Sequence, residues 1–363
     1  MFKTWAILVL LLSSAAAQTS GVLIGFSTFD DKRGEGETPQ LPSYHTLWIT
    51  HSGPKPQLVE SLDVLLIPTD EGWKRLGTAS YCTDFCQSGY YALQNLYLVG
   101  PHEAAQLRPT DSARCRRLLS SGKTSRAEAS YSVSAVGTDR VYWVNPSYIS
   151  HISDSSEFEP CEARGNRERV EAIVSELGHD MSGKLEFTQV PGKGLDEALA
   201  LAFEKARKGA AANGQECPAD IDMGSLSDWY IRRTAGEWRA FAYQWWIPNT
   251  CLLEAKIEAP LPENFVGQDH LAVPFETLRK IYPKLQDAFS SPLGDMLVLR
   301  LPGELHAFEM KDGVMPKEFT TIPLPDSGAD TVMIQWALNK FVSRWTAEIK
   351  QMKAAGFPKP ILR

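Results

Sequence analysis

Strand–turn–strand units with glycine in the turn recur along this chain and limit the folds that it can adopt. The sharpest unit is WYIRRT, Ala235-Gly236, EWRAFAYQWW, in which two runs rich in aromatic and β-branched residues flank a two-residue turn. Such turns join antiparallel strands, and glycine supplies the positive φ that they need. The sequence therefore predicts antiparallel hairpins rather than the strand–helix alternation of a parallel sheet.

Other parts of the chain repeat this pattern of strands and tight turns. A second hairpin is expected around Asp70-Glu71-Gly72, where glycine again occupies a turn position that favours positive φ. The polar segment 30–43 is expected to be an exposed loop between two strands. The expected strands outside the aromatic hairpin are residues 22–29, 44–50, 63–69, 73–81, 130–136, 140–145, 295–301, 304–310 and 319–324.

Four segments carry the apolar spacing of helices. Leu195 to Lys208 has acidic residues in its first turn and basic residues in its last. Glu168 to Leu177 is also expected to be helical, as is Pro274 to Phe289, which Pro283 should kink or divide. The longest expected helix, Ala329 to Met352, has an apolar stripe made of Ile334, Leu338, Phe341, Trp345 and Ile349.

These elements predict an α+β fold made mostly of antiparallel hairpins and meanders, with a few segregated helices including a long C-terminal one. The alternative is an irregular β-propeller-like arrangement, because residues 290–313 have the rhythm of one propeller blade. We expect an N-terminal β-rich region at 18–210 and a C-terminal α+β region at 211–363, or one single domain.

The first 17 residues, MFKTWAILVLLLSSAAA, have the layout of a secretory signal peptide. Lys3 precedes an apolar run, and Ala15 and Ala17 occupy the positions that a signal peptidase reads. The run is too short to cross about 30 Å of hydrocarbon. We therefore expect cleavage after Ala17 and a soluble protein that is secreted or periplasmic, with no membrane insertion after cleavage.

The charge balance bears on the partners that such a protein can have. The formal net charge is −7, which does not supply the broad positive field that nucleic-acid binding needs. We expect no nucleic-acid partner and no cofactor. A saccharide or another protein remains as the expected partner.

The six cysteines of an exported chain indicate disulfide bonds. The simplest pairing joins nearest neighbours, although six cysteines allow about 15 pairings. The Cys82–Cys86 spacing is C-x-x-x-C rather than the C-x-x-C of thioredoxin-like sites, so a structural bridge is favoured over a redox or metal site. The disulfide candidates are Cys82, Cys86, Cys115, Cys161, Cys217 and Cys251.

The aromatic hairpin provides the clearest candidate for ligand binding. Because alternate residues of a strand share a face, one face of 237–246 carries the candidate ligand residues. Tryptophans also occur on the opposite face, which a single buried face does not require. The alternative is that both faces are buried, one under a sheet and one under a helix. The candidate ligand residues are Arg239, Phe241, Tyr243 and Trp245.

Motifs for nucleophilic catalysis or metal binding are weak in this chain. No G-x-S-x-G occurs, and we expect no metal site. Histidine–carboxylate pairs such as His179-Asp180 and Asp269-His270 leave open a secreted hydrolase that uses groups from separate segments. The sequence favours an exported binding or interaction protein, with this hydrolase and a structural envelope component as alternatives.

Overall fold

The computed structural model describes residues 19–28, 43–51, 55–69, 72–85, 89–104, 127–139, 144–157, 167–176, 185, 187, 190, 192, 194–215, 217, 229–246, 251–262, 266, 270–324 and 326–358. Side chains are not described for 78–97, 127–176, 243–246 and 251–252. The expected signal peptide and most of the expected loop 30–43 lie outside the described residues.

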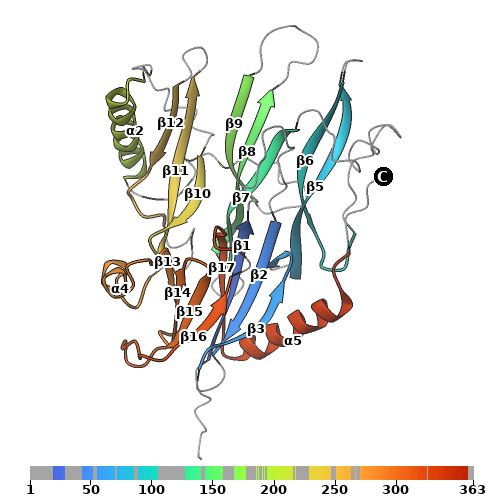
Figure 1. Cartoon of the computed structure of the whole chain (residues 1–363), viewed down its shortest axis with the longest axis vertical. Coiled ribbons are helices and arrows are strands. Elements are labelled where there is room, and N and C mark those ends of the chain that lie inside the picture. Colours follow the sequence, from blue (N-terminus) through green and yellow to red (C-terminus); the bar gives the residue numbers. More distant parts are fainter. Residues whose placement is uncertain are drawn as a thin grey trace, which may run out of the picture.

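A ten-stranded sheet forms the middle of the molecule (Figure 1). Its strand order is β3-β2-β1-β17-β7-β6-β5-β4, and β8 and β9 continue from β7. Most neighbours are antiparallel, but β7 runs parallel to both β17 and β6. The strands are β1 (Ser20–Thr28), β2 (Ser43–Thr50), β3 (Gln57–Leu62), β4 (Leu65–Thr69), β5 (Gly72–Phe85), β6 (Gly89–Val99), β7 (Ala127–Asp139), β8 (Val144–Glu157), β9 (Arg167–Glu176) and β17 (Asp330–Leu338).

Two smaller antiparallel sheets and three helices make up the rest of the described fold. The three-stranded sheet contains β10 (Trp229–Thr234), β11 (Glu237–Trp246) and β12 (Cys251–Lys256). The four-stranded sheet is a meander of β13 (Asp287–Ser290), β14 (Met296–Leu301), β15 (Glu304–Glu309) and β16 (Thr320–Pro323). The helices are α2 (Leu195–Ala212), α4 (Phe275–Ile281) and α5 (Lys340–Ala355).

The predicted α+β class is confirmed, and the hairpins expected around 235–236 and 70–72 are present. β10 and β11 have the expected bounds, and both residues of their turn have positive φ, 52° at Ala235 and 85° at Gly236. Glycine at position 72 has a φ of 119° where β4 turns into β5. The helix expected at 195–208 is also confirmed and extends to Ala212.

A regular propeller would require sheets of a similar size. Among the described strands the sheets contain ten, three and four members, so no unit of fixed size repeats, as the blades of a regular propeller do. β1 and β17, from opposite ends of the chain, pair along nearly their whole length. The division at 210/211 falls within α2 and stays a prediction.

The expected long C-terminal helix was wrong in its first half. Residues Asp330–Leu338 form β17, which pairs with β1 from Ser20↔Leu338 to Ser27↔Asp330. The chain breaks at Asn339, where φ is 52°, and only then enters α5. β17 is covered on both faces, and a strand of this kind lacks the alternation that would distinguish it from a helix.

Two other helix predictions also need correction. Arg167–Glu176 is the strand β9, paired antiparallel with β8, and its V-x-A-x-V segment alternates with the period of a strand. In 274–289 the helix α4 ends at Ile281, and the chain re-forms as strand β13. The ring of Pro283 disfavours helical geometry at the residue before it, which explains this early end.

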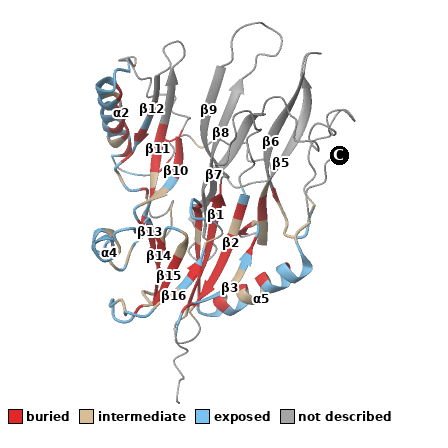
Figure 2. Cartoon of the chain, viewed as in Figure 1, coloured by how far each residue is buried: buried red, intermediate tan, exposed pale blue. Residues whose placement is uncertain are grey.

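Buried side chains lie on both faces of the central strands (Figure 2). On one face, Leu23 and Trp48 pack with Trp345 and Ile349 of α5. On the other face, hydrophobic residues of β1 and β2 pack against the four-stranded sheet. β1 and β2 are therefore enclosed between a helix and a second sheet. The second group includes Val22, Ile24, Leu47, Ile49, Phe289, Met296 and Val298.

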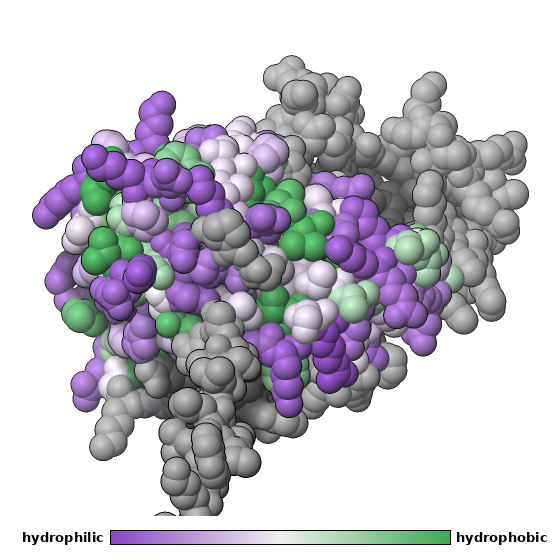
Figure 3. All heavy atoms as spheres, turned by 90° about the horizontal axis from the view of Figure 1, so that it is seen from below, coloured by the Kyte–Doolittle hydropathy of each residue, from purple (hydrophilic) through white to green (hydrophobic). Residues whose placement is uncertain are grey.

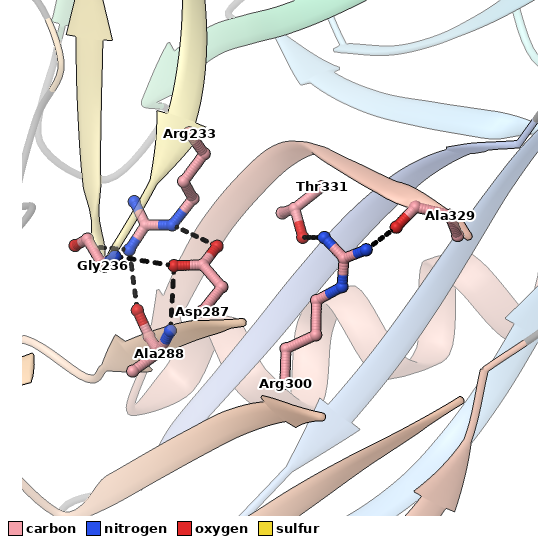
Figure 4. A network of polar contacts seen from close by, with 7 residues as sticks. All are labelled: Arg233, Gly236, Asp287, Ala288, Arg300, Ala329 and Thr331. Atoms are coloured by element: carbon pink, nitrogen blue, oxygen red, sulfur yellow. Dashed lines mark hydrogen bonds and ion pairs between the residues drawn. The ribbon is translucent and has the colours of Figure 1, made fainter. Parts of the chain in front are cut away.

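Two buried arginines connect the three sheets (Figure 4). Arg233 of β10 donates from Nε to the Asp287 carboxylate of β13 at 2.9 Å, and from Nη2 to the carbonyl oxygens of Gly236 and Ala288, both at 2.8 Å. Arg300 of β14 donates to Thr331 Oγ1 of β17 and to a carbonyl of the preceding segment. Burial lowers the pKa of the Arg300 guanidinium.

Among the described residues, no helix is long and apolar enough to cross a membrane.

Candidate functional site

The aromatic strand β11 is buried on one face over its first six residues, and on the other face it is buried at Phe241. Trp238, Ala240 and Ala242 point toward α2 and pack in one cluster with Leu199 and Phe203 of that helix. The edge of the Trp229 ring on β10 meets Phe187 at a centroid distance of 5.2 Å. This face of the hairpin is therefore hydrophobic core.

The opposite face holds the predicted ligand residues; among its described residues Phe241 is buried, Arg239 is partly buried and Glu237 is exposed. Phe241 is only 4% exposed and stacks on Tyr230 with ring centroids 5.2 Å apart. The guanidinium carbon of Arg232 lies 4.6 Å from the centre of the Phe241 ring. Phe241 is thus not available for stacking on a ligand, because its ring faces are occupied within the protein.

The other three predicted ligand residues differ in what the structure shows of them. Arg239 pairs with Glu237 and donates from Nη1 to the carbonyl of Glu258 at 2.6 Å. The backbones of Tyr243 and Trp245 pair with Glu254 and Leu252 of β12. The side chains of Tyr243 and Trp245 lie outside the described residues, and their role stays a prediction.

A second candidate site brings a histidine between two carboxylates. His51, directly after β2, has Nδ1 at 3.6 Å from Asp295 Oδ2 and Nε2 at 3.8 Å from Glu309 Oε1. Asp295 belongs to the turn between β13 and β14, and Glu309 ends β15. We call these three residues the His51 cluster.

Two serine hydroxyls fix the Asp295 carboxylate. Ser20 and Ser291 both donate to Asp295 Oδ1, at 2.6 Å and 2.5 Å. The hydroxyl of Ser291 also accepts from the backbone N–H groups of Asp295 and Met296. The orientation of the carboxylate beside His51 is therefore set by β1 and by its own turn.

The charges of the His51 cluster shift the pKa values of both His51 and Asp295. The contact with Asp295 raises the pKa of His51 and outweighs the opposing effect of burial. Burial alone would raise the pKa of Asp295, but the contacts with His51, Ser20 and Ser291 together hold it below its ordinary value. At neutral pH Asp295 is therefore ionised, and His51 is the group whose charge varies.

The cluster does not contain the contacts of a nucleophilic catalyst. A serine nucleophile would need its hydroxyl on an imidazole nitrogen, whereas Ser20 and Ser291 both donate to Asp295. Both nitrogens of His51 are buried, and neither has a hydrogen-bond partner among the described residues. Of the histidines predicted for a hydrolase, His270 is exposed and His179 lies outside the described residues.

Local sequence patterns could not reveal the His51 cluster. Its members lie at positions 51, 295 and 309, and the serines that support it lie at 20 and 291. The available signal was indirect: two strands that end in polar residues, and a serine and an aspartate that flank a Gly-containing turn. Only the packing of the four-stranded sheet on β1 and β2 brings these residues together.

Cys217 is the disulfide candidate whose bonded state the structure describes. Cys217 forms a disulfide and packs at the edge of the cluster that α2 covers. The backbones of Cys82 and Cys251 lie in β5 and β12, while Cys86, Cys115 and Cys161 lie outside the described residues. The pairing of the six cysteines stays a prediction.

Comparison with known proteins gives no family for this chain. No protein-family model and no curated protein matches it. A crystal structure described as a "putative 6-phosphogluconolactonase" from Bacteroides uniformis aligns with 88% of this chain and 99% of its own, at 9% identity and a TM-score of 0.23. The tricorn protease aligns with 77% of this chain and 26% of its own, at 8% identity and a TM-score of 0.19. Neither likeness is close enough to indicate a shared fold.

Proposed function

We propose that this chain is an exported binding protein and that the outer half of β11 contacts its ligand. The observation that carries the proposal is the way in which β11 is held. Its inner half is fixed by α2 on one face and by Tyr230 and Arg232 on the other. Among the described residues, the pairing of β10 with β11 reaches Trp229↔Ala242, and that of β12 with β11 reaches Trp246.

Alternation along the strand puts Tyr243 and Trp245 on the same face as Phe241. They continue that face past the end of the described pairing with β10. Aromatic rings carried on a rigid strand are suited to stacking on a sugar ring or on an apolar patch of a protein, because little side-chain entropy is lost on binding. A saccharide is the first ligand class to test.

Replacing Trp245 with alanine is expected to weaken ligand binding without changing the fold. We expect the affinity to fall by about 30-fold, because truncating a central aromatic contact costs about 2 kcal/mol. We expect the free energy of unfolding to change by less than about 0.5 kcal/mol. The measurements are calorimetric titration with oligosaccharides found in a thermal-shift screen, and urea unfolding of the same variant.

Trp246→Ala is the matched control, because it removes the same side chain from the opposite face of the same strand. It is expected to leave the affinity unchanged. If Trp245→Ala instead costs several kcal/mol of stability, Trp245 belongs to the core and the proposed surface is wrong. A panel of saccharides that gives no thermal shift rejects this ligand class and leaves an apolar protein patch for the same surface.

A further inference from the structure

We propose that the His51 cluster is a proton-controlled clamp between the ten-stranded sheet and the four-stranded sheet. Protonated His51 attracts Asp295 and Glu309 at the same time. After loss of one proton, the ring keeps a favourable contact with only one of these two carboxylates. The inference is independent of the ligand surface on β11.

The geometry favours a protonated ring because each nitrogen of His51 faces a carboxylate. An imidazolium has N–H groups at both Nδ1 and Nε2, so it can donate toward Asp295 and Glu309 together. A neutral imidazole has only one N–H, and its other nitrogen then presents a lone pair to a carboxylate. The neutral ring therefore keeps one favourable contact and gains one repulsive contact.

The clamp joins segments that are far apart in sequence. His51 is attached to β1 by its backbone N–H, which donates to the carbonyl of Ser20 at 2.8 Å. Asp295 is attached to β1 through the Ser20 hydroxyl, and its carbonyl accepts from the N–H of Met310, next to Glu309, at 2.8 Å. Opening the Glu309 contact would loosen the first residues of β1 and the turn before β14.

The exposed apolar side chains of the described residues do not gather into a docking surface. Leu58, Leu201 and Ile281 belong to β3, α2 and α4, and Val314 lies between β15 and β16. On the face seen in Figure 3, the coloured hydrophobic residues are separated by hydrophilic ones.

Among the described residues, the charged groups that face His51 are Asp295 and Glu309 alone.

The direction of the pH effect follows from the charge states. The folded protein raises the pKa of His51 above its ordinary value of 6.5. The clamp therefore contributes its full stabilisation below pH 6.5, and that contribution is lost as the pH rises through the higher folded value. Asp295, whose pKa is lowered, stays ionised throughout this window.

Hydrogen exchange of the whole chain tests the clamp. Backbone amides of 19–28 and 290–296 would be followed from about pH 6 to about pH 8.5, the range in which histidine titrates, after correction for the intrinsic exchange rate. In the unsubstituted protein we expect protection of both segments to fall with rising pH, by at most tenfold per pH unit for one proton.

His51→Gln is expected to remove this pH dependence, and His45→Gln is the matched control. His45 also lies on β2 and pairs with a carboxylate, Asp63, which is almost fully exposed, so this control should behave like the unsubstituted protein. Glu309→Gln keeps the Asp295 contact and is expected to fold with a weakened pH dependence. The proposal is overturned if protection does not change with pH, or if Glu309→Gln and any folded His51→Gln protein retain the full change.

Discussion

Replacing Arg233 with methionine is expected to lower the free energy of unfolding by about 3–5 kcal/mol, because it leaves a buried carboxylate without its cation. The side chains of Arg233 and Asp287 are only 3% and 5% exposed. Asp287 would keep its two backbone donors, Gly236 N–H and Ala288 N–H, but these do not replace a full positive charge. The measurement is urea unfolding at neutral pH.

A double-mutant cycle separates the ion pair from the rest of the junction. Asp287→Leu should also be strongly destabilising, because it leaves the guanidinium buried and the two N–H groups without an acceptor. The double variant Arg233→Met, Asp287→Leu should cost about as much as one single variant rather than their sum. Additive losses would mean that the two side chains do not act as a pair.

Arg239→Met is the control on the same hairpin. Arg239 pairs with Glu237, a partner that is about half exposed, and solvent screens such a contact. Its loss should cost less than about 1 kcal/mol. A similar loss from Arg233→Met and Arg239→Met would show that burial at the junction does not matter.

The hairpins could be predicted from sequence because their determinants are local. In β10–β11, two residues with positive φ fix the turn, and the alternation of Trp238, Ala240 and Ala242 with Arg239 and Phe241 fixes the strand period. The meander β14–β15–β16 is equally local. Each of these predictions needs only one continuous stretch of the chain.

The helix predictions failed where packing rather than local pattern decides the structure. Ile334 and Leu338 have helical spacing with Trp345, but they belong to β17 while Trp345 belongs to α5. Met333 packs toward α5, and Trp336 packs toward the four-stranded sheet. A strand with apolar contacts on both faces carries no signal of period two, so its pairing with β1 decides its structure.

In the candidate sites, too, local sequence predicted the position of a residue within its own strand but not its contacts with distant segments. The sequence correctly placed Phe241 on one face of a strand, but it could not show that Tyr230 and Arg232 cover that face. It also singled out histidines beside carboxylates, such as His179-Asp180, whereas the clustered histidine is His51, paired with a residue 244 positions later. Sequence neighbours and spatial neighbours differ because the sheets join distant segments.

Trp345→Ala is expected to destabilise the protein by about 3–5 kcal/mol, through lost burial and the cavity left behind. Trp345 is 1% exposed and lies at the centre of the contact between α5 and the ten-stranded sheet. Its ring centroid lies 5.8 Å from that of Trp48 and 5.1 Å from that of Trp73, the second pair in an edge-to-face arrangement. A cavity at this position would remove contacts from the two remaining indoles, and it cannot collapse without moving the helix.

Two hydrogen bonds next to this ring also depend on the position of α5, so a shift of the helix would add to the loss of stability. Trp48 Nε1 donates to Thr346 Oγ1 at 2.9 Å, and Trp73 Nε1 donates to Glu348 Oε2 at 2.7 Å. Trp345→Phe retains most of the ring volume and should therefore cost clearly less than Trp345→Ala. Lys350→Ala, on the exposed face of the same helix, should stay within about 0.5 kcal/mol. Equal losses for Trp345→Ala and Lys350→Ala in urea unfolding would show that α5 is not held to the sheet by its Trp345 face.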